Sequence, residues 1–125
     1  MNIRNACDLD IFSTARRFVD NLCGATEPER GFRSKARMNL LRKYGLKMLS
    51  ELIDGLTHNG YSRPPESIKK AAAILRAIKW ELCEALENRD ISIQSFASVI
   101  KNALETESMI NGVICPGRKT SYRRN

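Results

Sequence analysis

The sequence is poor in histidine and lacks the short motifs by which enzyme sites are usually recognised. It contains a single histidine, His58, which lies in a turn beside Asn59 and Gly60. General acid–base chemistry and activated serine or cysteine nucleophiles usually depend on a histidine. No G-x-S-x-G motif, G-x-x-x-x-G-K-[ST] loop or G-x-G-x-x-G fingerprint is present either. We therefore expect a non-enzymatic protein that uses no cofactor.

The cysteines lack the spacing of a metal site or of a disulfide framework. No two of them form a C-x-x-C pair, and the intervals between Cys7, Cys23, Cys83 and Cys115 are wide and irregular. Cys23 and Cys83 fall in helical patterns, where a reduced cysteine behaves as a small hydrophobic residue. We predict no bound metal and a reducing, cytoplasmic environment.

Long hydrophobic runs are also missing. No stretch approaches the roughly 20 apolar residues of a membrane span, and the first residues, MNIRNACDLD, carry acids where a signal peptide needs an apolar run. We expect no contact with a membrane. The chain nevertheless has 125 residues, 42% of them hydrophobic, which is enough to bury a core within one domain.

Apolar residues recur at intervals of three and four in four segments, and none of these segments alternates as a strand would. The segments cover residues 10–23, 34–56, 65–88 and 92–107. We predict an all-α fold: a small bundle, orthogonal or up-down, of four amphipathic helices, or five if Gly45 breaks the second. This single helical domain would span residues 1–115, followed by a short, flexible basic tail at residues 116–125.

Individual residues indicate where the helices end and how they pack. Ser34 and Ser92 suit the N-cap position, and Gly24 suits a left-handed residue that ends the first helix. Gly45 lies on the apolar stripe of the second helix, where it would allow another helix to approach closely. The residues after Glu107 are predicted to form a polar tail that contributes nothing to the core.

Three apolar residues of the second helix, Leu40, Leu46 and Ile53, fall outside its main stripe. A helix that is apolar on more than one side is either central in its bundle or covered by a second subunit. The sequence therefore makes a homodimer a hypothesis to test.

Positive charge is distributed unevenly along the chain. Lysine and arginine number 21 against 14 aspartate and glutamate residues, for a formal net charge of +7 at pH 7. The interval from Arg30 to Ser50 holds seven cations and no acid, so it accounts for the whole excess. Its cations are Arg30, Arg33, Lys35, Arg37, Arg42, Lys43 and Lys47. A second basic cluster, in the predicted tail, consists of Arg118, Lys119, Arg123 and Arg124.

Segregated positive charge of this kind attracts polyanions. On a helix that begins at Ser34, Lys43 and Lys47 are one turn apart and face away from the apolar stripe, toward a potential row of phosphates. We predict a non-enzymatic nucleic-acid-binding protein that grips the phosphate backbone with this helix and the tail. A small viral, phage or plasmid accessory protein would fit. The alternative is that the charge run is a solvated face that keeps a small protein soluble.

Double-stranded RNA is slightly favoured over DNA, because it can be held by shape and phosphate contacts alone. The segment SIQSFASVI resembles the first helix of a helix-turn-helix, with Ala97 at the small position. However, Lys101 stands where the turn glycine is expected, and Glu107 stands at the apolar position beyond it. This mismatch argues against a helix that reads the DNA major groove.

Trp80, the only tryptophan, falls on the polar side of its predicted helix, near Lys69, Ala73 and Arg76. It is either a stacking platform or partner contact with Arg76 beside it, or it is covered by another part of the chain, as most tryptophans are. The first option supports a rival function. In that case the protein is a helical interaction module, an adaptor or inhibitor that docks on an acidic protein with Trp80 as an anchor.

Overall fold

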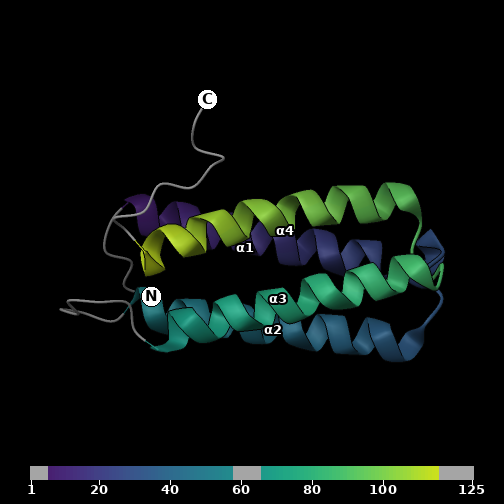
Figure 1. Ribbon diagram of the computed structural model, residues 1–125, viewed down its shortest axis with the longest axis horizontal. Coiled ribbons are helices and arrows are strands. Elements are labelled where there is room, and N and C mark those ends of the chain that lie inside the picture. Colours follow the sequence, from purple (N-terminus) through teal and green to yellow (C-terminus); the bar gives the residue numbers. More distant parts are fainter. Residues whose placement is uncertain (1–5, 58–65, 116–125) are drawn as a thin grey trace.

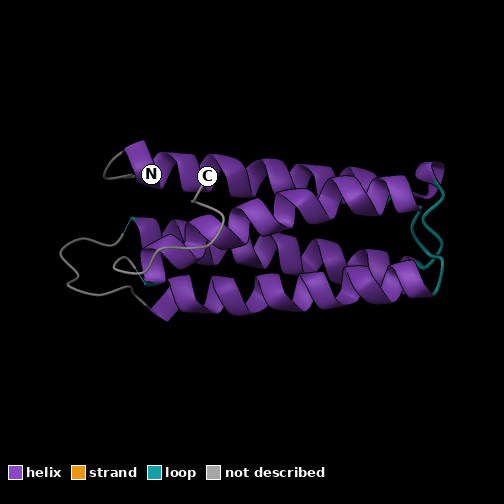
Figure 2. Cartoon of the chain, turned by 45° about the horizontal axis from the view of Figure 1, so that its top comes forward, coloured by secondary structure: helices purple, strands orange, loops and turns teal. Residues whose placement is uncertain are grey.

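The four amphipathic segments form four long helices in the computed structural model, which describes residues 6–57 and 66–115 and side chains from residue 9 (Figure 1). The helices are α1 (Ala6–Ala25), α2 (Lys35–Leu56), α3 (Glu66–Glu87) and α4 (Ile93–Ile114), with a short 3-10 helix, η1 (Pro28–Arg30), between α1 and α2. Within the described ranges the chain contains helices and loops but no strand (Figure 2). The predicted all-α bundle is therefore confirmed.

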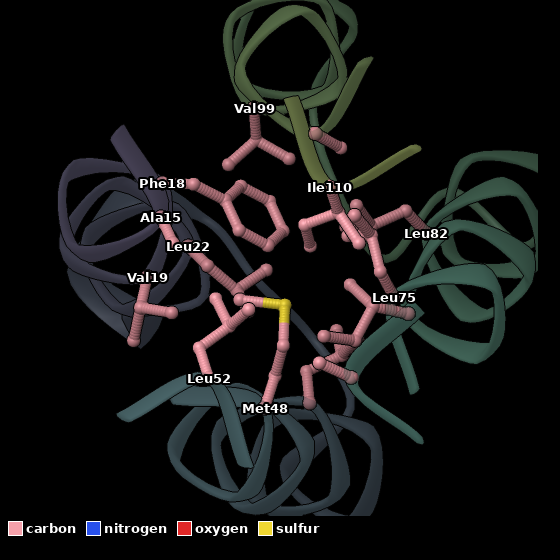
Figure 3. Close-up of a cluster of buried hydrophobic side chains, with 14 of the residues drawn as sticks. Ala15, Phe18, Val19, Leu22, Met48, Leu52, Leu75, Leu82, Val99 and Ile110 are labelled. Carbon is pink, nitrogen blue, oxygen red and sulfur yellow. The ribbon is translucent and has the colours of Figure 1, made fainter. Parts of the chain in front are cut away.

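Successive helices run in opposite directions, which decides for an up-down bundle over an orthogonal one (Figure 1). Each helix packs against its neighbours in the chain, and α1 also packs against α4. Viewed along the bundle, α2 therefore lies diagonally across from α4, and α1 from α3 (Figure 3). The α1–α2 and α3–α4 connections lie at the same end of the bundle, which we call the η1 end (Figure 1).

All four helices contribute fully buried side chains to one core along the bundle axis (Figure 3). The largest that the view labels are Phe18, Leu22, Met48, Leu52, Leu75, Leu82, Val99 and Ile110, each with no solvent exposure. Burying a side chain of this size stabilises the fold by roughly 1.5–3 kcal/mol. Gly45 is buried among them, and a Cβ added there would lie 3.3 Å from Val19 Cγ1. The predicted close approach of another helix at Gly45 is confirmed, and that helix is α1. The alternative that α2 breaks at Gly45 is wrong.

Both predicted N-caps are confirmed. The hydroxyl of Ser34 accepts a hydrogen bond from the backbone N–H of Arg37 at 3.1 Å, and the hydroxyl of Ser92 accepts one from the N–H of Ser95 at 3.1 Å. Each cap satisfies an N–H group that has no partner within its own helix. The polar residues before α2 and α4 thus define where these helices begin.

Two predicted helix ends are wrong. Gly24 does not terminate α1, because the helix continues to bury Ala25, and the left-handed glycine in this connection is Gly31, with a φ of 89°. The polar tail predicted after Glu107 is helical as far as Ile114, and Ile110 is fully buried. The apolar spacing did not reveal this continuation, because the polar residue Thr106 interrupts it. Thr106 occupies a buried position of the stripe, where its hydroxyl donates to the Asn102 carbonyl at 2.8 Å.

Arg89 ends α3 in the left-handed conformation, with a φ of 60°. The N–H of Asp90 donates to the carbonyl of Ala85 at 2.8 Å, and the N–H of Arg89 donates to the carbonyl of Leu86 at 3.1 Å. This pair of bonds is the Schellman motif, which usually has glycine at the left-handed position. A side chain there costs about 1 kcal/mol because its Cβ crowds the following carbonyl.

We expect Arg89→Gly to raise the free energy of unfolding by about 0.5–1 kcal/mol, because glycine adopts this φ without crowding. Arg89→Ala keeps the Cβ and should bring no such gain. Urea unfolding followed by circular dichroism measures both variants. A glycine variant no more stable than the alanine variant would contradict the argument.

Candidate nucleic-acid interface

Three lysines of the predicted basic helix are exposed on α2: Lys35, Lys43 and Lys47. Lys43 follows the fully buried Leu41 by two residues, so it points to the opposite side of the helix. Among the described residues, no carboxylate lies within 4.0 Å of these three amino groups. Their charges are therefore available to an external anion.

Arg37 has a different role, because it is tied to two acids of neighbouring segments. Its Nε lies 3.1 Å from Glu81 Oε1, and its Nη1 lies 2.6 Å from Asp90 Oδ2. Its side chain is only 19% exposed. Partial burial alone would lower its pKa, but the hydrogen bonds and charges of Glu81 and Asp90 raise the pKa of Arg37 above its usual value. Arg37 thus joins α2 to α3 and to the α3–α4 connection, and we leave it out of the interface.

Arg42 is also engaged within the chain. Its Nε donates to Thr26 Oγ1 at 3.1 Å, and its Nη2 donates to the Cys23 carbonyl at 2.9 Å. Cys23 lies in the last turn of α1, where a cation satisfies carbonyl groups and favours the helix dipole. Two of the seven clustered cations, Arg37 and Arg42, therefore hold helices together.

The remaining charge on α2 is arranged against the helix dipole. The first turn contains Lys35 and no acid, the last turn contains no lysine or arginine, and the acids Glu51 and Asp54 lie in the second half. Cations near a helix N-terminus are unfavourable by about 0.3–1 kcal/mol each. Helix stability therefore does not explain this distribution.

Arg30 and Arg33 extend the positive charge beyond the N-terminus of α2. Both are exposed, and together with Arg89 they line an open depression of about 760 Å³ at the η1 end. The sequence interpretation missed Arg89, because an Arg-Asp pair after a helix is an ordinary polar link. Only its position in the folded chain reveals it as a neighbour of the basic helix.

Trp80 is 66% exposed, so no described part of the chain covers it. Its two neighbours in the chain face the adjacent helices. Glu81 pairs with Arg37 of α2, and Lys79 Nζ lies 2.6 Å from Glu107 Oε1 of α4. Trp80 lies between these positions and points away from the bundle, with the exposed Arg76 one turn before it. The structure therefore does not bring Trp80 and Arg76 together with the cations of α2.

Four predicted site residues lie outside the described part of the chain: Arg118, Lys119, Arg123 and Arg124. The single histidine, His58, lies outside it as well. Among the described cysteines, Cys83 is exposed, and Cys23 and Cys115 are half-buried. In residues 6–57 and 66–115, no three histidine, cysteine or acidic side chains are grouped so that they could hold a metal ion. No helix in these ranges combines the length and hydrophobicity of a membrane span.

The described chain is an antiparallel four-helix bundle in which one helix, α2, exposes several cations. Comparison of the chain with protein-family models, with curated proteins and with solved structures finds no match. The function therefore has to be inferred from the geometry and charge of the site.

Proposed function

We propose that this protein binds nucleic acid without catalysis, by contacts between exposed cations and the phosphate backbone. One observation supports the proposal: five of the seven clustered cations are exposed, and none has a described carboxylate within 4.0 Å. These five residues form the basic surface, which consists of Arg30, Arg33, Lys35, Lys43 and Lys47. Because phosphate contacts carry no sequence information, little sequence specificity is expected.

The spacing of the lysines on α2 suits a repeating anion. Lys35 and Lys47 are twelve residues apart and therefore about 18 Å apart along the helix axis, which corresponds to about five phosphates of one strand. Lys43 and Lys47 are one turn apart on a helix whose opposite side is locked into the core. The helix backbone that carries these lysines therefore loses little freedom on binding, and the cost is confined to their side chains. Double-stranded RNA remains the favoured ligand, since its backbone can be recognised by shape.

A salt titration tests the proposal. Each phosphate contact releases counterions, so about four contacts should reduce the affinity for a duplex about 100-fold between roughly 50 and 200 mM salt. Fluorescence anisotropy with labelled RNA and DNA duplexes of unrelated sequences measures this dependence. No binding at the lowest salt concentration, or an affinity that does not change with salt, would overturn the proposal.

A second candidate function is a protein-interaction module that docks on an acidic partner. The observation that favours it is the exposure of two large apolar side chains on neighbouring helices, Trp80 at 66% and Leu104 at 47%. Exposed tryptophan is a common anchor of protein interfaces. If the salt titration detects no nucleic acid binding, this candidate takes precedence.

A homodimer and a reducing intracellular environment also remain proposals. Leu40 and Ile53 are half-buried within the bundle, and Leu46 is 63% exposed. A dimer formed through α2 would therefore cover mainly Leu46. Light scattering on the protein used in the titration determines its mass.

A further inference from the structure

The open depression at the η1 end gathers three arginines from three different segments. Arg30 belongs to η1, Arg33 precedes α2, and Arg89 follows α3. The remaining wall is largely apolar, formed by Leu86, Ile91 and Ile93. No described acid lines the depression, and no described carboxylate lies within 4.0 Å of the three guanidinium groups. The result is a hollow with concentrated positive charge beside an apolar wall.

Backbone hydrogen bonds hold the arginines in place before any ligand arrives. The N–H of Arg33 donates to the carbonyl of Asp90 at 3.0 Å, which joins the two connections of the η1 end. The carboxylate of Asp90 also accepts a hydrogen bond from Arg37 Nη1, so α2 is attached at the same point. The turn that carries Arg30 is closed by a bond of 2.9 Å from the Gly31 N–H to the Pro28 carbonyl. Binding therefore requires little further ordering of the backbone, which lowers its entropic cost.

The chemistry of this hollow suits a phosphate monoester with an apolar group attached. Guanidinium groups bind phosphate oxygens in pairs of hydrogen bonds, and a monoester carries more negative charge than a backbone diester because its second pKa is about 6. Ile93 is 76% exposed although it is a large apolar residue, and beside the arginines it offers a contact for a sugar or a base. A volume of about 760 Å³ lies within the usual range of ligand sites, roughly 300–1,000 Å³.

We propose that the depression binds a nucleoside phosphate monoester, either as the phosphorylated end of a strand or as a free nucleotide. The end of a strand would deepen the proposed function, on which it rests, because Arg30 and Arg33 also belong to the basic surface. The strand would then continue from the depression along α2, past Lys35 toward Lys43. Arg89 has no part in the basic surface and separates the two proposals experimentally.

The test compares two short duplexes that differ only in carrying a 5′-phosphate or a 5′-hydroxyl group. The wild-type protein should bind the phosphorylated duplex about tenfold more tightly, which is the contribution expected of one or two charge-assisted hydrogen bonds. Arg89→Gly should remove this preference while its affinity for the hydroxyl duplex changes less than about twofold. This variant relieves the left-handed conformation at Arg89, so a failure to fold is not expected. Lys43→Ala, the control, should weaken binding to both duplexes equally and keep the preference.

Free ligands distinguish the sources of the monoester. Adenosine monophosphate should shift the backbone NMR signals of Arg33, Arg89 and Ile93 in the wild-type protein and not in Arg89→Gly. If it does so while the two duplexes bind equally, the free nucleotide is the ligand and the proposal stands. If inorganic phosphate produces the same shifts at the same concentration, the nucleoside part of the proposal is wrong.

Equal affinity for the two duplexes, with no shift from adenosine monophosphate, overturns the inference. Salt-dependent binding of both duplexes in that experiment would leave the proposed function intact. Conversely, nucleotide-induced shifts without any duplex binding would retain the depression as a nucleotide site and overturn the proposed function. The two failures therefore give different results.

Discussion

Replacing Lys43 and Lys47 together with glutamate is expected to weaken binding to RNA and DNA duplexes by about 100-fold at low salt. A lysine–phosphate pair at 4 Å in water contributes about 1 kcal/mol, and charge reversal at two positions changes about 4 kcal/mol before screening by salt. The slope of log affinity against log salt should become shallower by about 2, because two phosphate contacts are lost. Fluorescence anisotropy measures both quantities. Both side chains are exposed, so the helical content should not change.

The matched control is Arg17→Glu with Lys101→Glu, which changes the net charge by the same amount. Lys101 is exposed on α4, diagonally across the bundle from α2, and the exposed Arg17 faces α4 in a hollow that it shares with Met109 (Figure 3). Binding to a local surface predicts that the control loses less than about tenfold in affinity, through the net charge alone. Equal losses in the two variants would mean that the overall charge, and not the basic surface, attracts the ligand.

Gly55→Ala is expected to lower the free energy of unfolding by about 2 kcal/mol, although alanine is ordinarily the better helix former. Gly55 lies in the last turn of α2, where α3 passes closely. A Cβ at this position would lie 2.5 Å from Ile68 Cγ1, closer still to Ile68 Cδ1, and 2.9 Å from Ser67 Oγ. Both neighbours are buried and cannot swing into solvent. The two helices would therefore have to separate.

Gly45→Ala is the matched control within the same helix. A Cβ at Gly45 would lie 3.3 Å from Val19 Cγ1, which a small shift can accommodate, and alanine gains about 1 kcal/mol of helix propensity. The two effects should nearly cancel, leaving stability within about 1 kcal/mol of the wild type. Urea unfolding followed by circular dichroism measures both variants. If both glycines tolerate alanine equally, the close contact at Gly55 does not limit the packing of α2 on α3.

The apolar spacing and the N-cap residues contained most of what defines the fold. Four amphipathic segments and the caps at Ser34 and Ser92 could be predicted because they depend on residues three or four apart. Whether Gly45 breaks the second helix stayed open, and the structure shows that it does not. The end of α4 could not be predicted, since a buried threonine is compatible with the stripe only when its hydroxyl bonds to the preceding turn, as Thr106 does. The local sequence pattern therefore predicted which helices form better than it predicted where they end.

At the candidate site, too, the sequence predicted one part and only the folded structure showed the rest. The run of cations in the sequence located the basic helix. It did not show that Arg37 and Arg42 are engaged within the chain whereas Lys43 and Lys47 are exposed. Arg37 is engaged because α3 brings Glu81 and Asp90 beside it, and Arg42 because α1 ends with its carbonyl groups toward α2. These partners are distant in sequence, so no local pattern contains them. The exposure of Trp80 likewise depends on which helices cover α3.

By itself, the sequence determined the four helices, the buried stripes of the first three and the gathering of positive charge between Arg30 and Ser50. These properties follow from interactions along one helix and from composition. The tertiary structure alone decided the up-down arrangement, the cations that remain available to an anion and the meeting of Arg30, Arg33 and Arg89 at the η1 end. The physical reason is that ion pairs and clusters of like charge form between side chains that only folding brings together.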